Sequence, residues 1–475
     1  MAQENAKKNA SETAKDIATA VKQFNDRSTT IQKTTNYYSG EHDLKFATDK
    51  FKNTFGNLFK SFALNVCPAI CDAVRDKLVI TGFRVESDGE GSGGVKDLPK
   101  EAWKIWQANR MGVRSGEIHK EASINGDAYA IVWVDEMKQV TIYPNKSANV
   151  TVFYDEESPG KILWAAKHWL TPEKLFRLNM YYPDRIERLV SKNKSEDGKL
   201  PEAKEFVQFE PAVPNPYGIV PVFHFANNGS IGGFGVSELH NAMPVQDALN
   251  KSVLDMLVTM EFASYRQRWA SGIEIEIDDE GKAKPPFTAG VEKLWITENA
   301  ETKFGDFEVT DLEQFLKVKD GFRTDIATVT GTPLHYFMLT GASFPQSGIS
   351  IEKLESRFLG KIRDRMESYG SVWENLMSFA LLIENKGKGV RLFTEWQDPA
   401  PLSEKEQLDN IVVKKDLGIT ERQALIEAGY GEEDVDKMLL EKEEIKQKMV
   451  QSFNAGEDLT NDNTDQQQTD VNVGS

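Results

Sequence analysis

The chain has 475 residues, of which 40% are hydrophobic and 28% charged, a composition typical of a soluble protein with several packed cores. Its net charge of −17 argues against a tight nucleic-acid binder, because such proteins carry a basic surface. Two cysteines, Cys67 and Cys71, are too few for a disulfide framework. Neither a signal peptide nor an apolar run long enough to span a membrane is expected.

The N-terminal half predicts a helical arm and an α+β region. Residues 1–35 are expected to form a poorly anchored arm. A helix that follows Pro68 and reaches residue 79 is expected to bury both cysteines as structural thiols, which we favour over a metal pair. A strand is predicted over 80–85 and a helix over 98–109. Five strands of a meander-like antiparallel sheet are then predicted over 128–134, 140–143, 150–154, 162–168 and 176–182.

The next segments break this pattern. Residues 191–204 and 211–217 are interpreted as surface excursions, the second because its prolines disfavour regular structure. A strand over 220–225 and a short helix around Leu239 are predicted to follow.

Two amphipathic helices with an insertion between them form the centre of the sequence. The first begins at Pro244, and the second opens with a capping box of Thr310 and Glu313 and ends at Gly331. The insertion predicts strands over 273–277 and 291–296. After a loop over 332–350, a third helix over 351–384 would span roughly 50 Å.

Elements of this length usually need neighbours to cover their apolar faces. One interpretation is burial against other copies of the chain, as in a closed ring. The other is a single large α+β domain with long internal helices. The pattern alone does not choose between them.

The C-terminal part predicts a strand over 390–394 and a helical module. Capping boxes stand at Ser403 with Glu406 and at Thr420 with Gln423, and Gly418 and Gly429 are expected to end the helices. Residues 431–475 hold twelve Asp or Glu against four Lys. From Phe453 onward, the composition predicts a disordered tail.

Enzyme motifs are absent or stand in the wrong context. Gly89-x-Gly91-x-x-Gly94 matches a dinucleotide fingerprint but lies in a polar loop without a βαβ unit, so a flexible turn is favoured. There is no Walker A motif, no nucleophile elbow and no paired histidine motif for a metal. The acidic run 278–280 could bind a cation, although a hairpin turn is favoured. We predict no catalytic residue, no metal and no cofactor.

Five short motifs occur in order: Tyr37-Tyr38-x-Gly40-x-His42, Asn215-Pro216-Tyr217-Gly218-x-x-Pro221-Val222, Gly235-Val236-Ser237-Glu238-Leu239, Pro244-x-Gln246-Asp247-Ala248-Leu249-Asn250-Lys251 and Gly331-Thr332-Pro333. Together they resemble the portal (head-to-tail connector) proteins of tailed bacteriophages, in particular the family typical of long-tailed phages of Gram-positive hosts. The resemblance covers residues 30 to 450.

The resemblance implies an α+β ring subunit, usually one of twelve copies. Its parts would be an arm (1–35), a wing of antiparallel sheet plus helices (36–236), a stem helix (237–267), a small α/β clip (268–308), a second stem helix (309–331), a tunnel loop (332–350), a long kinked helix and strand of the wing (351–399), a helical crown (400–452) and a disordered acidic tail (453–475).

The resemblance also suggests functional residues. One interpretation of the segment 332–350 is an ordinary exposed connection. As a tunnel loop, it would present short uncharged donors and glycine hinges, namely Thr340, Gly341, Ser343, Gln346, Ser347 and Gly348. Clip residues that dock partners would be Ile275, Asp278, Asp279 and Trp295. Five cations are either bore contacts or partners in subunit packing: Lys317, Lys319, Arg323, Lys361 and Arg363.

The expected function is a non-enzymatic channel for genome DNA at one capsid vertex of the virion, assembled in the host cytoplasm. Double-stranded DNA would bind weakly and without specificity, because tight phosphate binding would stall its movement. Other expected partners are the terminase large subunit, head-completion or adaptor proteins, and the major capsid and scaffolding proteins, with no membrane. The alternatives are a DNA-processing hydrolase with an unrecognised site and a scaffold or adaptor ring unrelated to DNA.

Overall fold

The computed structural model describes residues 2–43, 45–47, 49, 53, 64–85, 97–264, 268–272, 301–306, 312–337, 348–387, 390–400, 404–428, 430 and 432–461. The chain divides into two compact units, Met1–Trp396 and Gln397–Ser475. The first unit combines helices with antiparallel strands, and the second contains helices in its described residues. This content confirms the predicted α+β class. None of the helices in the described part is long and apolar enough to cross a membrane.

A five-stranded antiparallel sheet forms one layer of the first unit. Its strands follow chain order: β4 (Val150–Tyr154), β5 (Ile162–Leu170), β6 (Phe176–Tyr181), β7 (Arg185–Ser191) and β8 (Phe206–Pro214). The predicted excursions at 191–204 and 211–217 are therefore wrong where they overlap β7 and β8. Pro211 and Pro214 are tolerated because β8 is an edge strand, paired only with β7 and with an irregular register.

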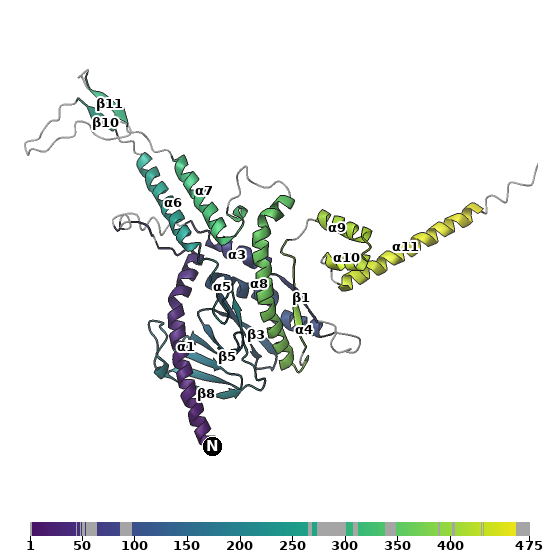
Figure 1. Cartoon of the computed structure of the whole chain (residues 1–475), viewed down its shortest axis with the longest axis horizontal. Helices are drawn as coiled ribbons and strands as arrows, with labels where there is room; N and C mark the ends of the chain where they lie inside the picture. Colours follow the sequence, from purple (N-terminus) through teal and green to yellow (C-terminus); the bar gives the residue numbers. More distant parts are fainter. Residues whose placement is uncertain are drawn as a thin grey trace, which may run out of the picture. The chain divides into compact units, whose positions relative to one another are not determined.

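Helix α1 (Ala2–Ser39) lies along this sheet (Figure 1). Its stripe of Ile17, Val21 and Phe24 is buried in one cluster with Phe176 and Leu178 of β6. The prediction of a poorly anchored arm is thus wrong, because the apolar spacing i, i+4, i+7 gives α1 a face that the sheet covers.

A second, three-stranded sheet has the order β3-β2-β9, from β2 (Asp127–Val134), β3 (Val140–Lys146) and β9 (Val222–Ala226). The five predicted strands therefore belong to two sheets and not to one meander. β2 is buried on both faces: Ala128, Ala130 and Val132 pack with the helices, while Tyr129 and Ile131 pack with β4 and β5.

Two helices cover the outer face of this second sheet, α5 (Met111–Asn125) and the long α8 (Gly348–Ile383). Helix α3 (Cys67–Lys77) packs against α5, and α4 (Leu98–Ala108) packs against α5, α8 and β1. The sequence did not predict α5, because Gly112, Ser115 and Gly116 weaken its helical pattern. β1 (Ile80–Val85) has the predicted bounds and pairs with β12 (Leu392–Trp396) beside α8. The core centre holds Trp106 against Trp373, with ring centroids 5.0 Å apart.

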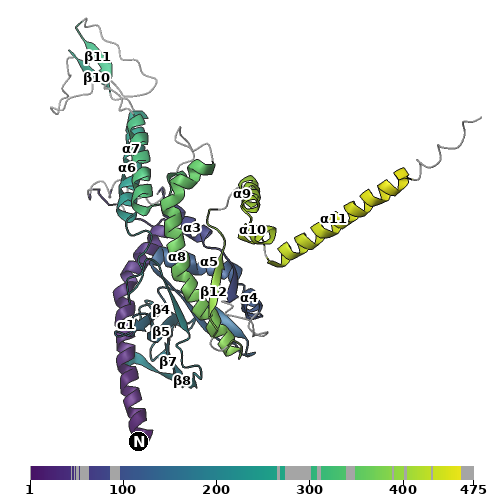
Figure 2. The same ribbon diagram turned by 45° about the vertical axis from the view of Figure 1, so that its right-hand side comes forward.

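An antiparallel helix pair, α6 (Met243–Ser264) and α7 (Glu313–Thr330), extends from this core, and both views show the two helices side by side (Figures 1 and 2). Between them, β10 (Arg268–Ser271) pairs with β11 (Lys303–Asp306). The strands predicted over 273–277 and 291–296 lie outside the described residues. Leu239 lies in a turn and not in the predicted short helix.

The ends of α7 test two expectations. Its N-cap is Leu312, which makes no side-chain capping bond, and the predicted first residue Thr310 lies outside the described residues. The predicted capping box of Thr310 and Glu313 therefore includes a residue that the structure does not describe. Gly331 ends α7 with a φ of 67°, the left-handed conformation predicted for it. The short 3-10 turn Leu334–Tyr336 follows, and α8 begins at Gly348.

The second unit contains α9 (Glu404–Asp416), α10 (Glu421–Glu427) and α11 (Glu432–Asn461). Thr420 caps α10 by accepting a hydrogen bond from the Gln423 N–H, and Gly418 closes α9 with a φ of 89°, as predicted. Ser403 and Gly429 lie outside the described residues. α11 continues past Phe453, the predicted start of the disordered tail, because extending an existing helix adds one hydrogen bond per residue without a new nucleus.

Candidate functional site

A buried polar cluster joins the end of α1 to the first two turns of α6. The Tyr37 hydroxyl donates to both carboxylate oxygens of Asp247, at 2.7 and 2.8 Å. His42 Nε2 donates to the Tyr37 carbonyl at 3.0 Å, and its Nδ1 accepts from the Asn250 amide at 2.7 Å. Lys45 Nζ lies 3.4 Å from the Asp247 carboxylate. We call these five residues the stem anchor.

Gln246 extends the stem anchor to the segment before α3. Its side-chain carbonyl accepts from the Val66 N–H at 3.1 Å, and its amide donates to the Leu64 carbonyl at 2.6 Å. Burial, reinforced by Asp247, raises the pKa of the neighbouring Cys67 thiol to about 12, so this thiol stays protonated at neutral pH. Cys67 and Cys71 are both free and buried, which confirms the expectation of structural thiols.

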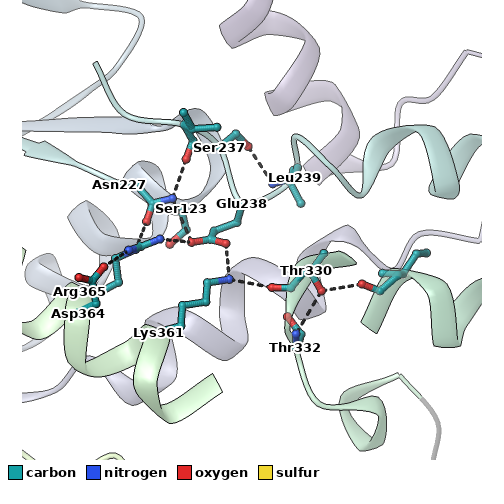
Figure 3. Close-up of polar contacts among 12 residues, drawn as sticks. Ser123, Asn227, Ser237, Glu238, Leu239, Thr330, Thr332, Lys361, Asp364 and Arg365 are labelled. Carbon is teal, nitrogen blue, oxygen red and sulfur yellow. Dashed lines mark hydrogen bonds and ion pairs between the residues drawn. The ribbon is translucent and has the colours of Figure 1, made fainter. Parts of the chain in front are cut away.

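A second polar cluster holds together α7, α8 and the turn that precedes α6 (Figure 3). Lys361 on α8 pairs with Glu238, and its Nζ also donates to the Thr330 carbonyl at the end of α7, at 3.2 Å. Arg365, one turn further along α8, donates to Glu238 at 3.2 Å and to the Asn227 side-chain carbonyl at 2.6 Å. We call these five residues the loop clamp, because they tie the last residue of α7 to the middle of α8, the two helices that flank residues 332–347.

Glu238 carries the only negative charge of the loop clamp, and its side chain is 8% exposed. Burial acts to raise the pKa of this carboxyl, but the Lys361 ammonium, the Arg365 guanidinium and the Asn227 amide outweigh burial. The pKa of Glu238 therefore lies below its ordinary value, and the group is ionised at neutral pH. The clamp is therefore held by charge-assisted hydrogen bonds from two cations to one buried carboxylate.

The position of Glu238 depends on a close backbone contact between two glycines. Asn227 N–H donates to the Gly126 carbonyl at 2.7 Å, and Val236 N–H donates to the Asn227 carbonyl at 2.7 Å. A Cβ on Gly235 would lie 1.9 Å from the Gly126 carbonyl oxygen, and Gly126 itself has a φ of 87°. Only glycine fits at both positions, which accounts for the first residue of the Gly235–Leu239 motif.

A third polar cluster lies just after the end of α7, around Glu355. His335 Nε2 lies 3.0 Å from Glu355 of α8, and Lys77 of α3 lies 3.7 Å from the same carboxylate. Beside the loop clamp opens a pocket of about 410 Å³, lined by polar side chains that include Arg357 and Asp364. The described part of the junction between α7 and α8 therefore has a polar side, while Tyr336 packs against Phe358 of α8 with ring centroids 5.9 Å apart.

Comparison with known proteins identifies the family. The sequence model of the family described as "Phage portal protein, SPP1 Gp6-like" matches residues 19–450. The chain belongs to this family. The portal protein of Mycobacterium phage L5 is 24% identical over 404 residues, which cover 77% of this chain and 76% of that protein. The portal protein of Mycobacterium phage D29 is 23% identical over 401 residues, covering 80% and 78%.

Family membership confirms the resemblance drawn from the five motifs and supports a phage portal role. The structure adds a physical reason for the motifs, because those at residues 37–42 and 244–251 form the stem anchor. The motif at 235–239 supplies Glu238 to the loop clamp, and Thr330 precedes the motif at 331–333. Asn215 of the remaining motif donates to the Tyr182 and Ile219 carbonyls and shapes the turn before β9.

The tunnel-loop and clip residues of this portal-family chain are not tested by the structure. Gly348 is the first residue of α8. The other predicted functional residues lie outside the described residues: Ile275, Asp278, Asp279, Trp295, Thr340, Gly341, Ser343, Gln346 and Ser347.

The five predicted cations occupy different environments. Lys317 pairs with Glu313 on an exposed face of α7, and Arg323 pairs with Asp320 with its side chain 21% exposed. Lys319 is half-buried, and Arg363 is exposed on α8. Lys361 belongs to the loop clamp, where its ammonium already has two partners within the chain. The structure therefore does not gather the five into one cluster.

Histidines in the described residues have structural surroundings. Burial lowers the pKa of His119 to about 3 and that of His168 to about 4, so both rings are neutral and packed. His224 lies between the Tyr154 hydroxyl and Asp127, at 2.6 and 2.7 Å, and Asp127 also pairs with Arg27 of α1. This buried chain ties α1 to both sheets. No group of three potential metal ligands occurs in the described part.

Three clamp residues, Arg365, Asn227 and Thr330, were not predicted from the sequence. Arg365 follows Phe358 and Ile362 and precedes Tyr369 on the buried stripe of α8, and only 6% of its side chain is exposed. A charge on an apolar stripe is the signal that could have marked it. Asn227 has no comparable signal, since asparagine is common in turns and its partners lie far away in sequence.

Proposed function

We propose that copies of this chain form a ring channel at one capsid vertex, through which genome DNA is packaged, retained and later ejected. The observation that supports this most strongly is the loop clamp. Lys361 joins the last residue of α7 to the middle of α8, so the two helices that flank residues 332–347 are tied to each other. A connection between two helices that are tied to each other suits a loop that contacts moving DNA.

In this proposal the parts have the roles that the family resemblance implies. Residues 36–236 and 351–399 form the wing, 237–267 and 309–331 the stem, and 400–452 the crown. The clip at 268–308 docks the terminase large subunit during packaging and head-completion or adaptor proteins afterwards. Capsid and scaffolding proteins surround the ring. Assembly takes place in the host cytoplasm, and the chain itself performs no catalysis and needs no cofactor.

The residues that touch DNA are assigned from their environment. Exposed Arg363 and half-buried Lys319 are the cations we propose for the bore. Lys361 is reassigned to the clamp, because its two partners within the chain leave it little capacity for phosphate. Loop residues such as Thr340 and Ser343 would add uncharged donors, which let DNA slide in either direction.

Sedimentation velocity and end-on electron micrographs of the purified chain test the ring. We expect closed rings of about twelve copies with no ATPase or nuclease activity. A compact monomer at every concentration, or a monomer with hydrolase activity, would contradict the proposal.

A deletion of residues 338–348 tests the loop. We expect rings of normal size and a loss of DNA packaging or retention in particles assembled with this variant. Replacement of the same residues by a Gly-Ser segment of equal length is the matched control, because it keeps the connection between α7 and α8. Normal packaging by the deletion variant would contradict the role of the loop.

A further inference from the structure

We infer that one face of the five-stranded sheet is an interaction surface for a second copy of this chain, and that it receives the acidic turn between β4 and β5 of that copy. We call this surface the Arg177 face; it is formed by Lys167, Trp169, Arg177, Val207 and Phe209. The inference goes beyond the proposed function, which names no surface between copies. It rests on that function in one respect, because the proposed ring supplies the neighbouring copy.

The two faces of this sheet have different surroundings. One face carries Phe176 and Leu178 beneath α1 (Figure 1). On the other face, beyond the part on which β2 packs, the register places four residues in one row across β5, β6, β7 and β8: Trp169, Arg177, Val190 and Val207. Phe209 lies on the same side as Val207, because side chains alternate along a strand. Val207 is 39% and Phe209 47% exposed, so the row lies open where it reaches β8.

Two cations of the Arg177 face have no ion pair among the described residues. The Arg177 guanidinium lies 3.3 Å from the centroid of the Phe209 ring, and the Lys167 ammonium lies 5.4 Å from that of Trp169. Glu173 attracts Arg177 through space without forming an ion pair in the described structure. Burial lowers the pKa of Lys167, as expected for an ammonium without a partner carboxylate. The chain itself therefore leaves two positive charges unpaired on this face.

The chemistry of the face favours a protein carboxylate over a nucleic acid. A guanidinium that lies flat on a ring keeps its edge N–H groups available, and these match a carboxylate in a bidentate pair. Nucleic-acid binding depends on many neutralised phosphates, often roughly six to ten, whereas two unpaired cations are present here. The neighbouring Arg188 and Glu210 pair with each other and add no net charge. An exposed aromatic ring beside an arginine is typical of the core of a protein–protein interface.

The β4–β5 turn of a second copy matches this face in charge. Glu156 and Glu157 are adjacent and exposed, and neither has an ion pair within the described part of the chain. Residues 155–161 hold three Asp or Glu against one Lys, which gives a net charge of −2. This charge is equal and opposite to that of the two unpaired cations, so the contact would neutralise both surfaces.

The position of the turn suits a ring. β4 and β8 are the two opposite edges of the sheet, so the turn and the open end of the Arg177 face belong to different edges of the same layer. A contact that joins two different surfaces is head-to-tail, and it repeats around a rotation axis until the ring closes. Such a contact needs no two-fold axis between neighbours. Each copy would give its turn to one neighbour and receive the turn of the other.

Photo-crosslinking of the full chain tests the inference. The probe is p-benzoylphenylalanine in place of Val207, on the Arg177 face. Leu170 is 42% exposed and lies on the opposite face of the same sheet, so the same probe at that position is the matched control. We expect the probe at Val207 to link two copies through a peptide that contains residues 155–161, and the probe at Leu170 to stay at background. Equal linking at both positions, or linking of Val207 to another peptide, would overturn the inference.

A charge exchange tests the pairing. With the probe at Val207, Glu157→Lys should lower the linked fraction roughly two- to fivefold, because like charges then meet. Glu136→Lys, in the exposed turn between β2 and β3, is the matched control and should leave linking unchanged. Arg177→Glu should lower linking as well, and its combination with Glu157→Lys should restore it. Glu157 lies in an exposed turn, so unchanged linking by Glu157→Lys overturns the inference even if Arg177→Glu fails to fold.

Sedimentation of the same samples separates this inference from the proposed function. Rings that form while the probe at Val207 links no copies contradict the Arg177 contact alone. Linked pairs that never close into rings support the contact and contradict the ring. A product with a different virion protein, or a nuclease-sensitive product with DNA in assembled particles, would assign the face to that partner and overturn the inference. A chain that stays monomeric without linking contradicts both proposals.

Discussion

At residue 365 the buried stripe of α8 carries an arginine that donates to both Glu238 and Asn227. We predict that Arg365→Met lowers the free energy of unfolding by about 3 kcal/mol, because Glu238 loses one of its two cations and Asn227 loses a charge-assisted bond. Urea unfolding of the full chain measures this. Arg363→Met, two residues earlier and exposed, should change stability by less than about 0.5 kcal/mol. Equal effects of the two substitutions would contradict the clamp.

Glu238 makes the stability of the clamp depend on pH. Its carboxyl has a lower pKa in the folded chain than its ordinary value of 4.5, so its stabilising contribution is present above pH 4.5 and is lost as the pH falls through the folded pKa. We predict that wild type loses stability below about pH 4.5 more steeply than Glu238→Gln, which has no proton to gain at this site. Urea midpoints measured between pH 3 and pH 7 provide the comparison. Parallel pH curves for the two proteins would show that Glu238 is not a stabilising carboxylate.

At the scale of elements, α1 owes its attachment to a few large side chains. Phe24 is 6% exposed and meets the ring of His168 edge-on at 4.3 Å. We predict that Phe24→Ala costs about 3–5 kcal/mol and makes α1 sensitive to proteolysis, because it leaves a cavity between the helix and the five-stranded sheet. Phe46→Ala is the control, since Phe46 is 68% exposed. Unchanged stability and protease resistance of Phe24→Ala would show that α1 is held by other contacts.

Elements with a strong local pattern could be predicted from the sequence, and those shaped by tertiary contacts could not. β1 and the ends of α7 and α9 at their glycines matched, because alternation and left-handed glycine are local signals. α5 was missed because its glycines lower helix propensity while burial against α3 and β2 stabilises it. β8 was missed because its prolines are unfavourable in most strands and acceptable only at an edge, a property of the whole sheet.

The same distinction holds for the candidate site. The motifs that contain Tyr37, Asp247 and Glu238 were found as isolated strings, but their contacts join residues more than a hundred positions apart. Lys361 was interpreted as a bore or packing cation because its sequence neighbours do not reveal Glu238 or the Thr330 carbonyl. Pairing of this kind depends on which elements the fold brings together, and one sequence does not encode it in any local pattern.

For the whole molecule, the charge of −17 bears on how the proposed ring would treat DNA. Each neutralised phosphate lowers the logarithm of affinity by about 0.9 per tenfold rise in salt, and six to ten neutralised phosphates cost about 10³–10⁵ in affinity between 50 and 200 mM salt. Because few bore cations are proposed per chain and acidic residues outnumber basic ones, we predict that assembled rings bind duplex DNA more weakly than about 10⁻⁴ M at physiological salt. Fluorescence anisotropy with a labelled duplex at several salt concentrations measures both affinity and slope.

The control for this measurement is Arg363→Gln, which removes one proposed bore cation without touching the loop clamp. If Arg363 neutralises phosphate, this variant should reduce the size of the salt slope by about one for each phosphate that is no longer neutralised, and ring size should stay the same. A steep slope in wild type, equivalent to about six neutralised phosphates or more, would mean that the bore holds DNA tightly. Such binding would create energy wells that oppose sliding, and the acidic chain would then need a basic lining that the described residues do not provide.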